Sequence, residues 1–333
     1  MYTINTPYPV RKMKNKDAVT KSYMKDNVRF ADIMNYCLYD GRKVIRPENL
    51  RELDTAMTAL PHAKSARSYP VQKYRDLLKY LYGMTDGTVV YLILGIENQS
   101  HVHYAMPVRN MLYDAGQYAE QVRKAEDCHA AKGEESGTDD EYLSGFFKND
   151  TLVPVVTLVI FWSAKPWDGP RSLHEMFGDR DSGVLAHVPD YRINLIAPRE
   201  MTEEDFEHLS SELKQVLRFI KHSENKKKMK ETVYADNAFR VMNRESVELL
   251  NTVTGAGIRI KTREEKVDMC AGIQGMIDDA VEAEQKRMAA ETAEHEAGLI
   301  RNIMRNMGLT ADFAMDAAGV PEERRAAIRM YLK

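Results

Sequence analysis

The sequence predicts an α/β fold followed by an all-helical C-terminal region. Two strand-like segments, 76–82 and 88–97, flank an Asp-Gly pair that is typical of a two-residue β-hairpin turn. The segment 152–162 is almost uniformly apolar and rich in β-branched residues, which indicates a strand buried on both faces. From Glu224 onward the pattern is helical throughout. These observations predict a mixed region of helices and strands that is followed by helices alone.

A first helix is expected after Asp26, which stands in an N-cap position, and it ends at Gly41. Its apolar residues recur at i, i+3, i+4, i+7 and i+8 and so form one face of a helix: Phe30, Ile33, Met34, Cys37 and Leu38. We interpret residues 42–70 as turns and short pieces because three prolines interrupt them.

A second helix is expected from Met106 to about Glu126, since Pro107 suits a first helical turn. It leads into the segment 127–150, which we interpret as an acidic surface loop. Residues 114–150 hold 10 acidic side chains against 4 basic ones.

After the buried strand, a shorter strand is expected at 191–196. Thr202 and Asp205 have the spacing of a capping box, which opens a helix that continues to about Lys221. The predicted order of elements is therefore α, β, β, α, β, β, α.

We expect two domains, residues 1–222 and residues 223–333. The second contains a long charged helix from Lys266 to about Met307 and ends in a helical hairpin. Such a hairpin has the outline of a DNA-binding helix-turn-helix, but a small helical cap or dimerisation piece is the favoured interpretation.

Composition narrows the class of protein. The 333 residues are 44% hydrophobic and 29% charged, with a net charge of −3, which excludes disordered and collagen-like chains. No apolar stretch approaches the ~20 residues that cross a bilayer, and no signal pattern opens the chain, so we expect a cytoplasmic protein without a membrane partner. Residues 1–79 hold 16 basic side chains against 8 acidic ones. This basic third is a candidate for phosphate contacts, and a merely solvated surface is the alternative.

Several enzyme classes lack their motifs here. The chain has no GxxxxGK[ST], no GxGxxG after a strand, no HExxH and no GxSxG. His101 and His103 share one face of an extended segment, but a solvated loop is favoured over a zinc site. Three scattered cysteines form neither a CxxC pair nor a disulfide framework.

The hairpin places two carboxylates opposite each other. If Asp86 and Gly87 form the turn, counting outward along both strands pairs Asp76 with Glu97. Gln99 lies on the same face as Glu97 because side chains alternate along a strand. Opposed carboxylates repel, and a divalent cation would offset that repulsion, since Mg²⁺ binds one or two carboxylates together with waters and substrate phosphates. A longer turn, or ordinary surface carboxylates near strand ends, are the alternatives.

A longer pattern surrounds these residues. It comprises Tyr74-Arg75-Asp76-Leu77-Leu78, Asp86-Gly87, Tyr91-Leu92-Ile93-Leu94-Gly95-Ile96-Glu97-Asn98-Gln99-Ser100, Met106-Pro107-Val108-Arg109 and Tyr113. This pattern resembles the recombination-promoting nuclease (Rpn), or YhgA-like transposase, family of the PD-(D/E)XK nuclease superfamily. In that family an Asp enters one strand, E-x-Q-S ends the next, and the following helix carries Met, Arg and Tyr. The resemblance is specific over about residues 26–120 and looser to about residue 220.

The resemblance implies a restriction-endonuclease-like core, a mixed sheet flanked by helices in the order α-β-β-β-α-β. It also implies a bacterial Mg²⁺-dependent DNA endonuclease, associated with mobile elements or recombination, in which Mn²⁺ is able to replace Mg²⁺. Asp76, Glu97 and Gln99 would be catalytic. Asp76 and Glu97 would bind the metal together with the backbone carbonyl of Asn98.

The resemblance adds three weaker candidates and one departure. Arg109 and Tyr113 would contact DNA, Arg109 at a phosphate, although a plain surface arginine is the alternative. Asp26 matches an acidic position before the first helix of the family, but as an N-cap it needs no catalytic role. Gln99 stands where the superfamily more often has Lys, and this removes a cation that could orient the attacking water.

Two functions therefore stand side by side at this point. The first is a DNA endonuclease, with the C-terminal helices as a candidate surface for forming homo-oligomers. The second is a catalytically weak or inactive protein on the same fold, which binds DNA or a protein partner without cutting. The carboxylates favour the first function, and Gln99 in place of Lys favours the second.

Overall fold

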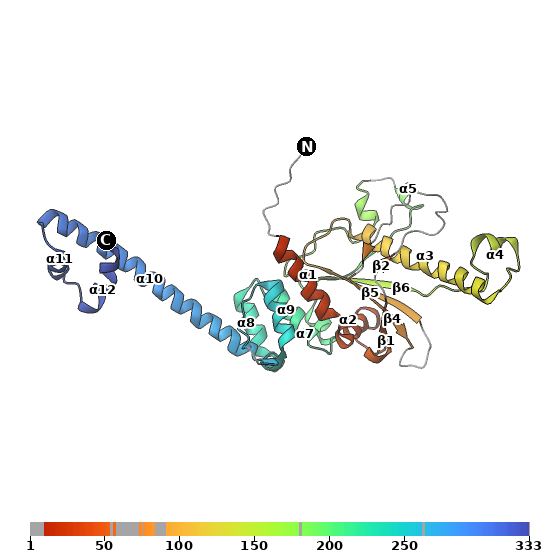
Figure 1. The fold of residues 1–333 in the computed structure, drawn as a ribbon, viewed down its shortest axis with the longest axis horizontal. Coiled ribbons are helices and arrows are strands. Elements are labelled where there is room, and N and C mark those ends of the chain that lie inside the picture. The colour runs from red at the N-terminus through yellow and green to blue at the C-terminus, as the bar shows by residue number, and fades with distance from the viewer. Residues whose placement is uncertain are drawn as a thin grey trace. The chain divides into compact units, whose positions relative to one another are not determined.

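The computed structural model describes residues 10–53, 56–57, 73–74, 76–83, 91–179, 182–261 and 264–332 of the chain. The chain divides into two compact units, Met1–Met269 and Cys270–Lys333. The larger unit contains a mixed sheet with helices around it, which confirms the predicted α/β class, and the smaller unit is helical (Figure 1).

A five-stranded mixed sheet forms the centre of the larger unit. Its strands lie in the order β1 (Leu50–Glu52), β4 (Leu77–Tyr82), β5 (Tyr91–Gln99), β6 (Val155–Phe161) and β7 (Asn194–Ile196). The pairs β1–β4 and β4–β5 are antiparallel, whereas β5–β6 and β6–β7 are parallel. β6 is an interior strand with five buried residues in succession, as its apolar sequence predicts.

The register of β4 against β5 agrees with the predicted hairpin. Leu77 pairs with Ile96 and Tyr82 with Tyr91, which is the pairing obtained by counting outward from a two-residue turn. The turn residues themselves, Asp86 among them, lie outside the described residues. β1 was not expected, because its three residues lie among the prolines of the 42–70 segment.

Three longer helices precede or follow this hairpin: α1 (Val10–Met24), α2 (Asn27–Tyr39) and α3 (Met106–Lys132). The predicted N-cap of α2 is confirmed, since the Asp26 carboxylate accepts from the N–H groups of Val28 and Arg29 at 3.0 Å each. The helix ends where Asp40 and Gly41 both take left-handed backbone conformations. α1 was not expected from the sequence.

Two expectations for the flanking segments are wrong. The segment 127–150 is not one loop, because α3 continues to Lys132 and α4 (Asp139–Ser144) follows. Arg123 pairs with Glu120 and Asp127 on adjacent turns of α3, which supports the helix beyond the predicted end.

The single helix expected from Thr202 to Lys221 is interrupted, although its capping box is present. It forms α6 (Glu203–Glu207) and α7 (Leu213–His222). Between them, the backbone N–H and hydroxyl groups of Ser210 and Ser211 donate to the carboxylate of Asp32 at 2.6–2.9 Å. These hydrogen bonds to Asp32 of α2 hold Ser210 and Ser211 outside a helix.

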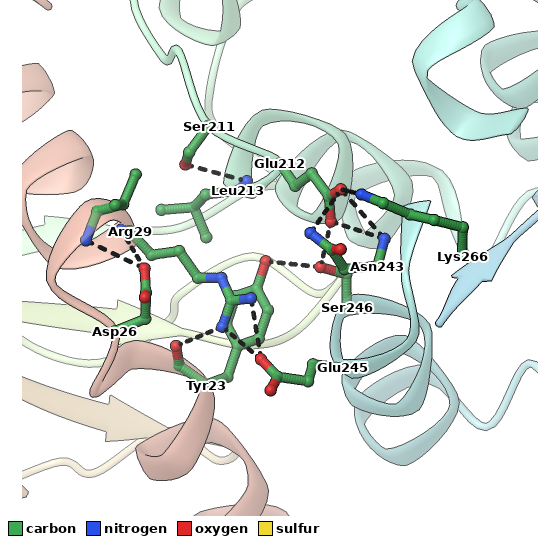
Figure 2. Close-up of polar contacts among 11 residues, drawn as sticks. Tyr23, Asp26, Arg29, Ser211, Glu212, Leu213, Asn243, Glu245, Ser246 and Lys266 are labelled. Atoms are coloured by element: carbon green, nitrogen blue, oxygen red, sulfur yellow. Dashed lines mark hydrogen bonds and ion pairs between the residues drawn. The ribbon is translucent and has the colours of Figure 1, made fainter. Parts of the chain in front are cut away.

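The larger unit continues beyond residue 222, where the sequence pattern becomes helical. α8 (Lys226–Ala235) and α9 (Arg244–Thr254) pack against α7, and α9 also packs against α1. Figure 2 shows the polar contacts between these helices: Glu212 accepts from Ser246 at 2.8 Å, and the Ser246 and Tyr23 hydroxyls lie 3.2 Å apart. The change of pattern at Lys221 therefore does not coincide with the end of this unit.

The remaining short elements of the larger unit are 3-10 turns at Pro47–Asn49, His174–Met176 and Asn237–Val241, helix α5 (Ser182–Leu185), and strands β2 (Ala56–Met57), β3 (Lys73–Tyr74), β8 (Met242–Asn243) and β9 (Lys266–Val267). β2 pairs with β3, and β8 with β9.

The smaller unit confirms the long helix and the terminal hairpin. It consists of α10, which begins at the unit boundary (Met269–Met307), α11 (Ala311–Ala317) and α12 (Glu322–Tyr331). The three helices share a small apolar core: Ala293, Ala297, Ile300, Ala314, Met315 and Ile328. Among the described residues, no helix combines the length and the apolar character that crossing a membrane requires.

Candidate functional site

Asp76 and Glu97 meet where β4 begins, as the register predicts. The backbone N–H of Asp76 donates to Glu97 Oε1 at 3.3 Å. The backbone N–H of Asn98 donates to Asp76 Oδ2 at 2.8 Å. The two carboxylates are therefore held on one side of the sheet by backbone groups of each other's strand.

Glu97 is fully buried, and its charge is compensated by Arg109. Arg109 lies in the first turn of α3, and its Nη2 is 3.1 Å from Glu97 Oε2. Its Nε also donates to the Tyr113 hydroxyl at 3.1 Å, one turn further along the helix. The sequence-based expectation of uncompensated repulsion between the carboxylates is therefore wrong, because a guanidinium already faces one of them.

The helix that carries Arg109 is positioned by packing against the sheet. Met106, at the start of α3, belongs to an apolar cluster with Val159 and Phe161 of β6 and with Trp167. Phe161 is the register partner of Gln99 at the end of β5. The first turn of α3 thus lies beside the end of the strand that bears Glu97.

The backbone of Asn98 faces Asp76. In an antiparallel pair, the N–H and C=O of one residue point to the same neighbouring strand, so the carbonyl of Asn98 is directed to the side on which its N–H meets Asp76. The carbonyl of the next residue, Gln99, points toward β6, where it accepts a hydrogen bond from the backbone N–H of Trp162 at 2.8 Å. The Asn98 side chain is anchored as well, because its Oδ1 accepts from Trp162 Nε1 at 2.9 Å.

These residues surround a cavity of about 200 Å³, which we call the carboxylate cavity. Its walls are Asp17, Asp76, Asn98, Gln99, Ser100, His101, Val102, His103 and Arg109. It brings together Asp76, Asn98, Gln99 and Arg109 among the predicted site residues, whereas the fully buried Glu97 is not among its walls. The Tyr113 hydroxyl accepts a hydrogen bond from Arg109, whereas Asp26 caps α2 and is absent from the cavity walls.

Sequence reasoning missed one titratable residue of this cavity, Asp17, and considered another, His103, only for zinc. Asp17 comes from α1, whose sequence gives no clear helical face. His103 was considered for zinc, but burial and the nearby Arg109 charge lower its pKa. Among the described residues, no three His, Cys, Asp or Glu side chains gather closely enough to hold a metal ion by themselves.

Burial raises the pKa of Asp76 above its ordinary value of 3.8, against the opposing effects of the Asn98 N–H and of Arg109. A raised native pKa contributes stability that is present below the unfolded value and is lost as the pH rises through the native pKa. Ionised Asp76 is therefore a cost to the metal-free fold at neutral pH.

We accordingly expect Asp76→Asn to stabilise the metal-free protein at pH 7, by ~0.2–1 kcal/mol, the scale of effects between opposed strand residues. The gain should disappear below pH 3.8, where the unfolded carboxyl is protonated as well. Urea unfolding in EDTA at both pH values measures this. Asp26→Asn is the control, since Asn serves about as well as Asp at an N-cap, and a gain of equal size there would contradict the prediction.

No protein-family model matches the chain, and no curated protein or solved structure matches it either.

Proposed function

We propose that the chain is a metal-dependent DNA endonuclease with a PD-(D/E)XK-type core. The observation that carries this proposal is the meeting of Asp76 with the fully buried Glu97 beside a cavity that Asp76 lines, with the carbonyl of Asn98 on the same side. Two carboxylates and a carbonyl are hard oxygen ligands of the kind that Mg²⁺ prefers.

The order of elements supports the same proposal. α2, the antiparallel strands β1, β4 and β5, helix α3 and the parallel strand β6 follow one another along the chain. This is the α-β-β-β-α-β order that the family resemblance implies. In this arrangement the carboxylates come from the second and third strands.

The donor set fits one divalent cation that completes its coordination with water and substrate. Asp76, Glu97 and the Asn98 carbonyl would hold it, and Mg²⁺ usually needs no more than one or two carboxylates from the protein. When bound, such an ion polarises a phosphoryl oxygen and lowers the pKa of a bound water.

The chain's own residues have separate tasks in this proposal. Asp76 and Glu97 supply negative charge, and the Asn98 N–H keeps the Asp76 carboxylate oriented. Gln99 borders the cavity and is able to donate a hydrogen bond to a phosphate or to water, but it carries no charge. Arg109 is held by Tyr113 at the cavity wall, where a phosphate would meet its guanidinium.

Nicking of supercoiled plasmid tests the proposal. The purified full-length chain should convert supercoiled DNA to the open-circular form with Mg²⁺ or Mn²⁺, and EDTA should stop the reaction. Undiminished cutting in EDTA would contradict metal dependence.

A second function is favoured by one specific observation, the ion pair between Arg109 and Glu97. The Arg109 guanidinium occupies Glu97, an expected metal ligand, and Gln99 stands in place of a lysine. Both features suit a protein that has a nuclease fold but binds DNA or a partner protein without cutting. Gel-shift binding of DNA in Mg²⁺ without any nicking, at protein concentrations that saturate the DNA, would favour this function.

The proposal also assigns a role to the residues that follow the sheet. We place the nuclease residues within 1–222, inside a compact unit that continues to Met269, and assign residues 223–333 to assembly or DNA engagement, with homo-oligomers formed through the C-terminal helices. A DNA substrate is consistent with a cytoplasmic protein that acts on mobile elements or in recombination. Light scattering of the full chain and of a chain that ends at Met269 measures the contribution of the last helices.

A further inference from the structure

Three cavities of the larger unit adjoin one another. The carboxylate cavity shares Ser100, His101 and Val102 with a central cavity of about 670 Å³. The central cavity in turn shares Ala164, Pro166 and Glu224 with a third cavity of about 320 Å³. Because they share wall residues, the three cavities adjoin one another in this order.

The third cavity is cationic. Arg199, Lys221, His222 and Lys228 line it, and Glu224 is the single acidic side chain among its walls. Lys221 is tied to the carbonyl of Met201 through its ammonium group. We call this space the cationic cavity.

Two of its cations, Arg199 and Lys228, are exposed to solvent. Within the described part of the chain, neither the Arg199 guanidinium nor the Lys228 ammonium forms an ion pair or a side-chain hydrogen bond, and both residues are exposed. By contrast, the neighbouring Arg218 is paired with Glu203 and Glu207. The free charges at this cavity are available to an anion from solution.

The central cavity has walls of a different kind. Tyr104, which is 63% exposed, and His101 offer flat rings, whereas Phe161 and Ile220 behind the cavity are buried, at 2% and 0% exposure. Its volume lies in the ~300–1,000 Å³ range of small-molecule sites. Exposed flat rings suit the faces of unpaired bases, which a duplex keeps stacked and hidden.

We propose that the cationic cavity binds a phosphate of a single nucleic-acid strand whose bases pass through the central cavity toward the carboxylate cavity. The proposal rests on the nuclease function for the identity of the ligand and adds its class: an unpaired strand. The strand's backbone is held at two places, by Arg199 and Lys228 at one end and by Arg109 of the carboxylate cavity at the other.

Anisotropy of a labelled single-stranded oligodeoxynucleotide tests this, with the full chain in EDTA so that no cleavage occurs. Lys228→Ala and Arg199→Gln should each weaken binding and reduce the slope of log K against log salt concentration by ~0.7, the value for one phosphate contact to a single strand. Lys227→Ala is the matched control: it removes the same charge one residue away, from a lysine that is 87% exposed, paired with Glu231 and outside the cavity walls.

The outcomes separate this inference from the proposed function. The inference is overturned if Lys228→Ala and Lys227→Ala lose equal affinity for the single strand. It is also overturned if Lys228→Ala and Arg199→Gln weaken the binding of a duplex with the same sequence as much as that of the single strand. Both conclusions hold even if the protein cuts DNA. A loss of affinity for the single strand that is confined to Lys228→Ala and Arg199→Gln supports the inference. If the plasmid is never nicked, this result still supports the inference, and only the nuclease function is refuted. Thermal melting of each variant confirms that the fold is retained.

Discussion

Asp76→Asn and Glu97→Gln should each abolish metal-dependent cleavage of plasmid DNA. Both substitutions remove one negative charge and keep the shape of the side chain, so that a divalent cation loses a charged ligand while the hairpin stays intact. The expected loss in rate is at least ~10²–10³-fold, the scale observed when a single electrostatic group is removed from a catalytic site. Initial nicking rates at saturating Mg²⁺ measure this loss.

The matched control is Asp26→Asn, the same change at a carboxylate that only caps α2. Its nicking rate should equal that of the wild type. If the double variant of Asp76 and Glu97 cuts as fast as the wild type, the carboxylate cavity is not the active site, and the chemistry lies elsewhere in the chain.

Arg109→Ala should destabilise the metal-free protein, because it removes the guanidinium that is ion-paired with the fully buried Glu97. Breaking a buried pair by removing one partner costs ~3–5 kcal/mol. The Arg109 side chain is 29% exposed, which admits water to the vacated place and puts the expected loss at the lower end of that range. Urea unfolding in EDTA measures the difference.

Mg²⁺ should then restore part of this loss. In the wild type the Arg109 guanidinium competes with a cation for Glu97, whereas Arg109→Ala removes this competitor. Ligand at ten times its Kd adds about 1.4 kcal/mol to the native state. Thermal melts with and without Mg²⁺ should therefore show a larger increase in Tm for Arg109→Ala than for the wild type.

Arg123→Ala controls for the loss of an arginine from the same helix. Arg123 pairs with Glu120 and Asp127 on an exposed face of α3, so its removal should cost no more than ~1 kcal/mol and should leave the response to Mg²⁺ unchanged. If Mg²⁺ raises the Tm of the wild type and of Arg109→Ala equally, Glu97 is not a metal ligand.

The pairing of Asp76 with Glu97 could be predicted from the sequence because the hairpin is a local structure. A side-chain period of two and a two-residue turn fix every cross-strand pair once the turn is located. The cap at Asp26 was predictable for the same reason, since its partners Val28 and Arg29 are two and three residues away.

The partner of Glu97 could not be predicted, because it depends on where α3 packs. The sequence places Arg109 on a helix, but only the apolar contacts of Met106 with β6 bring that helix to the end of β5. The break between α6 and α7 is similar, because the serines there bind Asp32, which is far away in the sequence. Asp17 was missed since no strong apolar stripe marks α1 as a helix.

The anchoring of Asn98 by an indole makes the site visible by fluorescence. The chain contains two tryptophans, and Trp162 both lines the central cavity and donates to the side chain of Asn98. Trp167 packs edge-on against Phe161, another wall of that cavity, with ring centroids 5.3 Å apart. Both indoles therefore lie at or next to the central cavity, and Trp162 is bonded to Asn98 of the carboxylate cavity. A ligand that alters the polarity there changes the emission maximum, and the unlabelled protein reports its own occupancy during a titration.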